Sequence, residues 1–350
     1  MSPAKADRRW SALALIVTAQ FMVILDVAIV NVALPSIKSD LDFSQANLQW
    51  VISAYAIMFG GVLLLGGRLA DVLGRRRLFL AGLTLFAVSS LLCGFAWSEA
   101  SLIGFRALQG LGGALLAPAA LSLLMTIFAE GRERNLALGI YGAASGSGAA
   151  VGVLLGGVLT SYLSWSWVFF INVPVGLAAI ALTPLLLSDD RAASTTRHFD
   201  LRGAVSVTSG LMLLVYATTR ATTEGWSAPL TIALFAGSAA LVLAFVVFEL
   251  RSPSPLLPMR IFRSRTLTGA NLAMAIVGGV AFSEFFLLTL YMQQVLHYSA
   301  LKTGVAYIAL TLTTIAFSAV AQGLVTKIGV RIVLPVGLAL STVALVLFAQ

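Results

Sequence analysis

Three charged residues, Asp26, Arg106 and Glu284, lie within long apolar runs of this 350-residue chain. A charged side chain is costly inside a bilayer and is usually retained for a partner or a function. Asp26 would lie about 22 Å from the inner end of an outward-running helix, and Arg106 about 8 Å from the outer end of an inward-running one. These depths coincide in about 30 Å of hydrocarbon. We therefore expect Asp26 and Arg106 to form an ion pair.

Such a pair could load and release a proton. Burial disfavours the charged carboxylate and a neighbouring arginine favours it, so a change in helix packing could shift the balance. The alternative is a static buried pair that only fixes helix register. Glu284, at a similar depth, is a second candidate for proton coupling. It could instead attract a cationic substrate or pair with a polar group of further spans.

The chain offers little for other chemistry. Cys93 is its only cysteine, and His198 and His297 lie far apart in the sequence. A disulfide framework, a cysteine-based metal site and a catalytic triad are therefore not indicated. We find no convergent nucleophile or metal cluster, and we expect no metal, no cofactor and no enzymatic activity.

The elements that must position these residues are membrane-spanning helices. Hydrophobic residues make up 59% of the chain and charged ones 10%, with a mean hydropathy of +0.97. A soluble domain of this composition would expose one continuous apolar surface. We expect an all-α integral membrane protein, since runs of about 20 apolar residues can each span a bilayer. The runs are 11–34, 48–70, 78–98, 101–125, 137–160, 166–187, 201–219, 228–249, 266–293, 303–325 and 331–350.

Polar linkers divide these runs into three parts: an N-terminal six-helix half (1–187), cytoplasmic linkers with two additional helices (188–265), and an incomplete C-terminal half (266–350). The last run reaches the chain end without a polar flank. We therefore expect a C-terminally truncated chain with 11 of a probable 14 spans, which does not transport by itself. A short internal repeat supports the division, because Gly74, Arg76 and Gly82 align with Gly329, Arg331 and Gly337.

Most of the 22 lysines and arginines fall in alternate loops, on the side of the N-terminus. Loops rich in lysine and arginine stay in the cytoplasm. We expect a multi-pass protein of the bacterial inner membrane with a cytoplasmic N-terminus, and no binding of nucleic acid. The basic cluster at 251–265 could alternatively contact lipid headgroups.

A polar loop between the second and third runs contains Gly67, Asp71, Gly74, Arg75 and Arg76. The glycines permit a tight turn, and an aspartate beside arginines can form a charge-assisted latch. The pattern Gly-x-Leu-Ala-Asp-x-x-Gly-Arg-Arg strongly resembles the signature loop of the major facilitator superfamily. A topogenic basic loop with a helix cap is the alternative.

The fifth run carries regularly spaced glycines. Ala144, Gly148, Gly152 and Gly156 recur every four residues and would form one smooth face for close helix packing. Together they resemble the antiporter motif that marks exporters in the superfamily, with Val153 where the family has proline. The motif residues are Gly139, Gly148, Gly152, Gly156 and Gly157.

Other stretches resemble the fourteen-span drug–proton antiporter group of this superfamily. They are Leu25-Asp26-x-x-Ile29-Val30-Asn31-Val32-Ala33-Leu34-Pro35, Gln49-Trp50-x4-Tyr55, Arg106-Ala107-Leu108-Gln109-Gly110 and Trp165-x-Trp167-x-Phe169-x-Ile171-Asn172-Val173-Pro174. The resemblance implies the major facilitator fold and the alternating-access export of small hydrophobic or cationic drug-like compounds, driven by the proton gradient.

We expect the substrate pathway to be mostly apolar, and the chain to act as a monomer among membrane lipids. The candidate pathway residues are Phe21, Asn31, Tyr55, Gln109, Phe282 and Tyr291. A dedicated exporter of a natural product, lipid or siderophore is the alternative within transport. A non-transporting membrane sensor is the alternative outside it.

Overall fold

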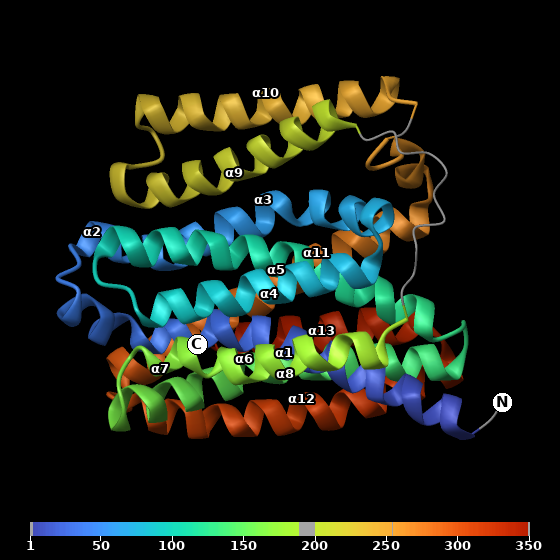
Figure 1. Ribbon diagram of the computed structural model, residues 1–350, viewed down its shortest axis with the longest axis horizontal. Helices are drawn as coiled ribbons and strands as arrows, with labels where there is room; N and C mark the ends of the chain where they lie inside the picture. The colour runs from blue at the N-terminus through green and yellow to red at the C-terminus, as the bar shows by residue number, and fades with distance from the viewer. Residues whose placement is uncertain (1–2, 189–199, 254, 349–350) are drawn as a thin grey trace.

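The computed structural model describes residues 3–188, 200–253 and 255–348, and these form helices joined by short turns, with no strand in the described part (Figure 1). The helices are α1 (Pro3–Asp40), α2 (Gln45–Leu48), α3 (Trp50–Leu73), α4 (Arg75–Gly94), α5 (Glu99–Ile127), α6 (Arg132–Tyr162), α7 (Trp167–Phe170), α8 (Asn172–Leu186), α9 (Leu201–Glu224), α10 (Pro229–Arg251), the 3₁₀ helix η1 (Met259–Arg263), α11 (Arg265–Leu290), the π-helical turn η2 (Tyr291–Val295), α12 (Ala300–Ile328) and α13 (Val330–Phe348).

Each of the eleven predicted spans coincides with a long helix, or with the α7–α8 pair. Within the described residues, nine of these segments are long and apolar enough to cross a membrane. Helices α9 and α11 are not among the nine, so for them the span assignment stays a prediction. The ninth span is also less regular than expected, because helix α11 ends at Leu290 and a π-helical turn continues from Tyr291.

Glycines set the spacing between the helices around α5. A Cβ atom on Gly82 of α4 would lie 2.7 Å from the backbone nitrogen of Leu116, and one on Gly112 of α5 would lie 2.6 Å from that of Phe86. Such distances are too short for any side chain, so α4 and α5 can pack this closely only with glycine at both positions. Helix α3 approaches α5 in the same way, with the backbone of Tyr55 against Gly110.

Helices α9 and α10 form a hairpin along one side of the bundle, next to α3 (Figure 1). The Ser238 hydroxyl donates a 2.8 Å hydrogen bond to the Gly210 carbonyl and joins the two helices. On the α3 side, the rings of Trp50 and Tyr216 lie 5.6 Å apart. The two helices of the hairpin pack against each other and, through α9, against α3. The exact boundaries of the parts stay a prediction, because residues 189–199 lie outside the described residues.

The two loops of the proposed internal repeat share one backbone feature. Gly74, between α3 and α4, has a φ of 97°, and Gly329, between α12 and α13, has a φ of 83°. Positive φ strongly favours glycine, since a Cβ atom would clash with the backbone there. The same special conformation at aligned positions supports the repeat.

Candidate functional site

The predicted ion pair is present and completely buried. Nη1 of Arg106, on α5, lies 2.6 Å from Oδ2 of Asp26, on α1, and the two side chains are 1% and 0% exposed. Ser98 caps the start of α5 with its hydroxyl and so fixes Arg106 two turns into that helix. The contact between Asp26 and Arg106 that the sequence predicts is confirmed by this geometry.

Two side-chain amides complete the surroundings of Asp26. Nε2 of Gln109 donates to Oδ1 at 2.8 Å, and Nδ2 of Asn172 donates to the same oxygen at 2.9 Å. All three partners of the carboxyl group are therefore donors. An ionised carboxylate only accepts hydrogen bonds, whereas a protonated one must also donate. The arrangement fits the deprotonated form of Asp26.

Arg106 is held on several sides at once. Its Nε donates to the carbonyl of Val51 at 2.9 Å, and its Nη1 also donates to Oε1 of Gln109 at 2.7 Å. The ring of Tyr55 lies 4.4 Å below the guanidinium carbon. A cation–π contact and three hydrogen bonds stabilise a charge that would otherwise be very costly to bury.

A second layer of polar groups orients Asn172. Its Nδ2 also contacts Oγ of Ser90 at 3.0 Å, and that hydroxyl donates to the Phe169 carbonyl at 2.8 Å. Asn172 begins α8, directly after the chain leaves the short helix α7 at Ile171. Asn172 lies within one of the family-like stretches, but the sequence motifs assign it no role. A lone amide in an apolar span is the signal that could have identified it.

Glu284 is not brought to this pair. It lies partly buried on α11, and no hydrogen bond or ion pair joins it to another residue in the described part of the chain. Its suggested role in proton coupling stays a proposal.

The candidate pathway residues lie in three different environments. Tyr55 and Gln109 are buried against the ion pair, and Phe21 packs beside Leu25 and Ile29 in the neighbouring apolar cluster. Asn31 is exposed and donates to the carbonyl of Val27, and Tyr291 is 52% exposed. The side chain of Phe282 lies outside the described residues. Among the described pathway residues, the structure thus gathers Tyr55 and Gln109 around the ion pair and leaves Asn31 and Tyr291 exposed.

The glycines of the fifth predicted span face α1, as the four-residue spacing predicts. A Cβ atom would lie 3.0 Å from Ile24 Cγ2 at Gly148, 2.8 Å from the Leu25 carbonyl at Gly152, and 3.0 Å from the Ile29 carbonyl at Gly156. Gly157 is buried, whereas Gly139 faces Gln322 of α12. The residues of α1 that contact these glycines include Leu25 and Ala28, which lie one residue before and two residues after Asp26.

The expected polar loop is helical except at Gly74, because Asp71 belongs to the end of α3 and Arg75 to the start of α4, and these two residues form a weak ion pair. Oδ1 of Asp71 lies 3.9 Å from Nη2 of Arg75, with side chains 54% and 32% exposed. Arg76 is partly buried beside them. Gly74 supplies the positive φ of the turn.

A Cβ atom on Gly67 would meet Pro118 at an ordinary 3.9 Å, whereas the preceding Gly66 is pressed against the Ala114 carbonyl. Close packing thus depends on Gly66, which the motif reading did not single out.

We expect Asp71→Asn to change the free energy of unfolding by less than about 0.5 kcal/mol, because an exposed pair at this distance contributes little. Thermal unfolding of the purified protein in detergent at low and high salt would measure the change. Glu130→Asn, which removes another exposed i,i+4 pair with Arg134, is the control. A loss of several degrees specific to Asp71→Asn would show that the latch stabilises this conformation strongly.

Long apolar helices around a buried, fully hydrogen-bonded ion pair define a multi-pass helical membrane protein with a polar site inside its bundle. The sequence profile described as Major Facilitator Superfamily matches residues 16–350. The chain therefore belongs to this superfamily of membrane transporters.

Several relatives are antibiotic resistance or export proteins. The chain is 45% identical to the puromycin resistance protein of Streptomyces alboniger, over 87% of this chain and 60% of that protein. It is 44% identical to the cephamycin export protein of Amycolatopsis lactamdurans, over 87% of this chain and 63% of that protein. The chain thus spans less than two thirds of the length of these relatives.

Among solved structures, the chain resembles a peptide transporter crystallised with sulfate. The TM-score is 0.62 and the sequence identity 17%, over 91% of this chain and 69% of that one. At this identity the likeness establishes the fold alone.

Proposed function

We propose that the protein exports small hydrophobic or cationic drug-like compounds across the bacterial inner membrane, in exchange for protons. The observation that carries this proposal is the buried Asp26–Arg106 pair, with a carboxylate held by three donors. The names of the relatives add support for export, since they include a multidrug transporter of Bacillus subtilis that is 31% identical.

The proposed coupling follows from what a proton would do to Asp26. Protonation would remove the charge that Arg106 pairs with, and it would place a donor where all present partners also donate. The contacts of α1 with α5 and α8 would weaken together. A proton would thus favour a different packing of α1, and a ligand that binds one packing better shifts the population toward it.

The glycine face of α6 offers a route for that change to spread. Helix α6 contacts α1 through Gly148, Gly152 and Gly156. It also contacts α12, where Gly304 is pressed against the backbone of Leu154. A movement of α1 would therefore displace α6 and change the contact between α6 and α12. Alternating access requires such a coupled movement of the two halves. We further propose a cytoplasmic N-terminus, action as a monomer, and no need of a cofactor besides the proton gradient.

A dedicated exporter of one natural product is the second candidate. It is favoured by relatives named for single antibiotics, puromycin, cephamycin and lincomycin. The two candidates share the same coupling site and differ only in the breadth of the substrate pocket.

We expect cells that express the complete gene to expel fluorescent cationic dyes, and an uncoupler to stop this efflux because it dissipates the proton gradient. Efflux from energised cells, with and without uncoupler, would be measured for a dye panel and for the three antibiotics. Export of one antibiotic and no dye would select the dedicated exporter. Efflux that resists the uncoupler would contradict proton coupling.

A further inference from the structure

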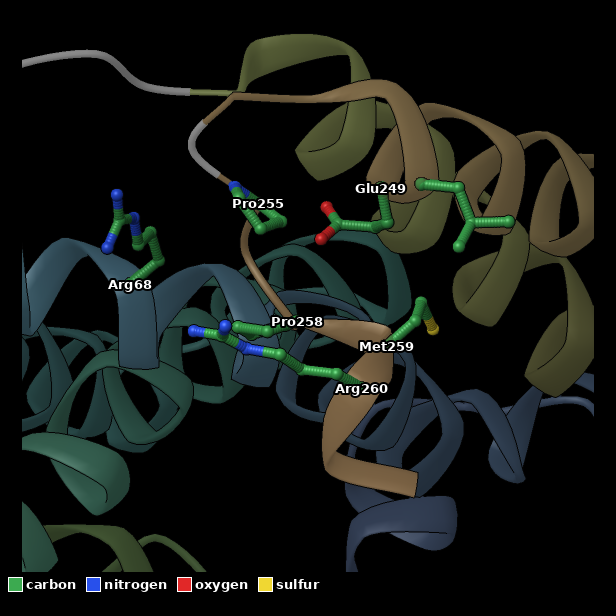
Figure 2. Close-up of a pocket in the computed structure, with 7 residues that line it drawn as sticks. Arg68, Glu249, Pro255, Pro258, Met259 and Arg260 are labelled. Atoms are coloured by element: carbon green, nitrogen blue, oxygen red, sulfur yellow. The ribbon is translucent and has the colours of Figure 1, made fainter. Parts of the chain in front are cut away.

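A pocket of about 500 Å³ lies where α3, the end of α10 and η1 meet, and none of its lining residues belongs to the ion-pair site (Figure 2). Arg68 comes from α3, Glu249 and Leu250 from the last turn of α10, and Arg260 from η1. The pocket is lined by Arg68, Glu249, Leu250, Pro255, Pro258, Met259 and Arg260. Neither the proton coupling nor the substrate pathway proposed above uses these residues.

Within the described residues neither arginine of the pocket makes a hydrogen bond or ion pair, although the charge of Arg68 acts on nearby Glu249. Nε of Arg68 is buried and donates no hydrogen bond to any acceptor in the described part of the chain. No ion pair within that part joins Arg68 or Arg260 to an acidic residue. In Figure 2 the guanidinium of Arg260 extends from η1 toward the α3 side of the pocket, where Arg68 lies. A buried guanidinium nitrogen without an acceptor is costly, so an acceptor supplied by a ligand would be favourable.

The carboxylate of Glu249 already accepts hydrogen bonds from backbone amides. It is 4% exposed, and its Oε1 and Oε2 accept the amide hydrogens of Leu256 at 3.2 Å and Leu257 at 2.8 Å. These bonds fold the segment after α10 over the pocket and partly compensate the carboxylate. The charged side chains that line the pocket are two arginines and one carboxylate, while a second carboxylate, Asp200, lies close to Glu249 outside the lining.

We propose that this pocket binds the phosphate group of an anionic membrane lipid. Arginine binds phosphate with paired N–H donors, and Arg68 and Arg260 offer two such groups from different elements. The pocket lies at the end of α10, a helix long and apolar enough to span a membrane, and the ends of such helices lie at the level of the lipid headgroups. The apolar side chains of Leu250, Pro258 and Met259 suit the glycerol and upper acyl carbons of a lipid.

A phosphate at this position would bridge α3 to η1. Arg68 precedes Asp71 of the polar loop by less than one helical turn, while η1 leads directly into α11. A bound lipid would therefore connect the α9–α10 hairpin and its following linker to α3.

The test is a titration of the purified full-length protein in detergent with dioctanoyl phosphatidylglycerol and, separately, with inorganic phosphate, by thermal unfolding and native mass spectrometry. Arg68→Gln with Arg260→Gln removes two charges from the pocket. Arg263→Gln with Arg265→Gln removes two charges from the same basic segment outside it. We expect the pocket variant to bind the lipid about tenfold or more weakly than wild type, and the control variant to bind within about threefold of wild type.

Arg260→Gln alone, an exposed substitution, keeps the test valid if the pocket double variant does not fold. It should still weaken lipid binding several-fold. Displacement of the lipid by millimolar inorganic phosphate would support recognition through the phosphate. Binding of inorganic phosphate by a protein that does not bind the lipid would overturn the lipid as the source of the phosphate. Equal losses in the pocket and control variants, or no binding of either probe, would overturn the site.

Discussion

Asp26→Asn is expected to abolish uncoupler-sensitive efflux and to destabilise the protein. Asparagine retains the shape of the side chain but cannot take up a proton or pair with the charge of Arg106, which is 1% exposed. Leaving one partner of a buried pair uncompensated costs about 3–5 kcal/mol. Efflux from energised cells and thermal unfolding in detergent would both be measured, with Asp26→Glu as the variant that keeps the charge.

The double variant Asp26→Asn with Arg106→Gln separates coupling from a structural role. No unpaired charge is then buried, so stability should return toward wild type, because neutral replacements of a buried pair are often tolerated. Efflux should stay absent if Asp26 carries the proton. Recovery of uncoupler-sensitive efflux in the double variant would instead mean that the pair only fixes helix register, and Glu284 would become the leading candidate for coupling.

The sequence allowed the pair itself to be predicted because depth in a membrane depends on residue count alone. Asp26 and Arg106 lie in the first and fourth predicted spans, which run in opposite directions, and each residue adds a fixed rise. The same reasoning could not identify the contacts of Gln109 and Asn172 with Asp26. Those depend on the rotation of α5 and α8 about their axes, which tertiary packing decides.

The motifs were informative about spacing and less so about individual residues. The four-residue repeat of Gly148, Gly152 and Gly156 correctly predicts one packing face, since a helix returns to nearly the same side every four residues. Near the end of α3, however, Gly66 makes the close approach instead of Gly67 of the motif. Adjacent helix positions point about 100° apart, and only the three-dimensional contact with α5 distinguishes them.

Gly152→Ala is expected to destabilise the protein and to impair efflux at the same time. The added Cβ atom would lie 2.8 Å from both the Leu25 carbonyl and Ala28 Cβ, and 3.2 Å from the Ile29 nitrogen. Two of these atoms are backbone and cannot rotate away, so α1 must move. Overpacking of this kind costs about 1–3 kcal/mol, against which alanine regains up to about 1 kcal/mol of helix propensity.

Gly142→Ala on the same helix is the matched control, because nothing lies within 4 Å of its added Cβ atom. It carries the same gain in helix propensity without the clash, so its unfolding temperature should equal or exceed that of wild type. Leu25 and Ala28 flank Asp26 on α1, and displacing them would also displace the carboxylate from Arg106. Efflux should therefore fall in Gly152→Ala beyond what the loss of folded protein explains. An unfolding temperature of Gly152→Ala equal to that of Gly142→Ala would show that α1 and α6 do not need this close contact.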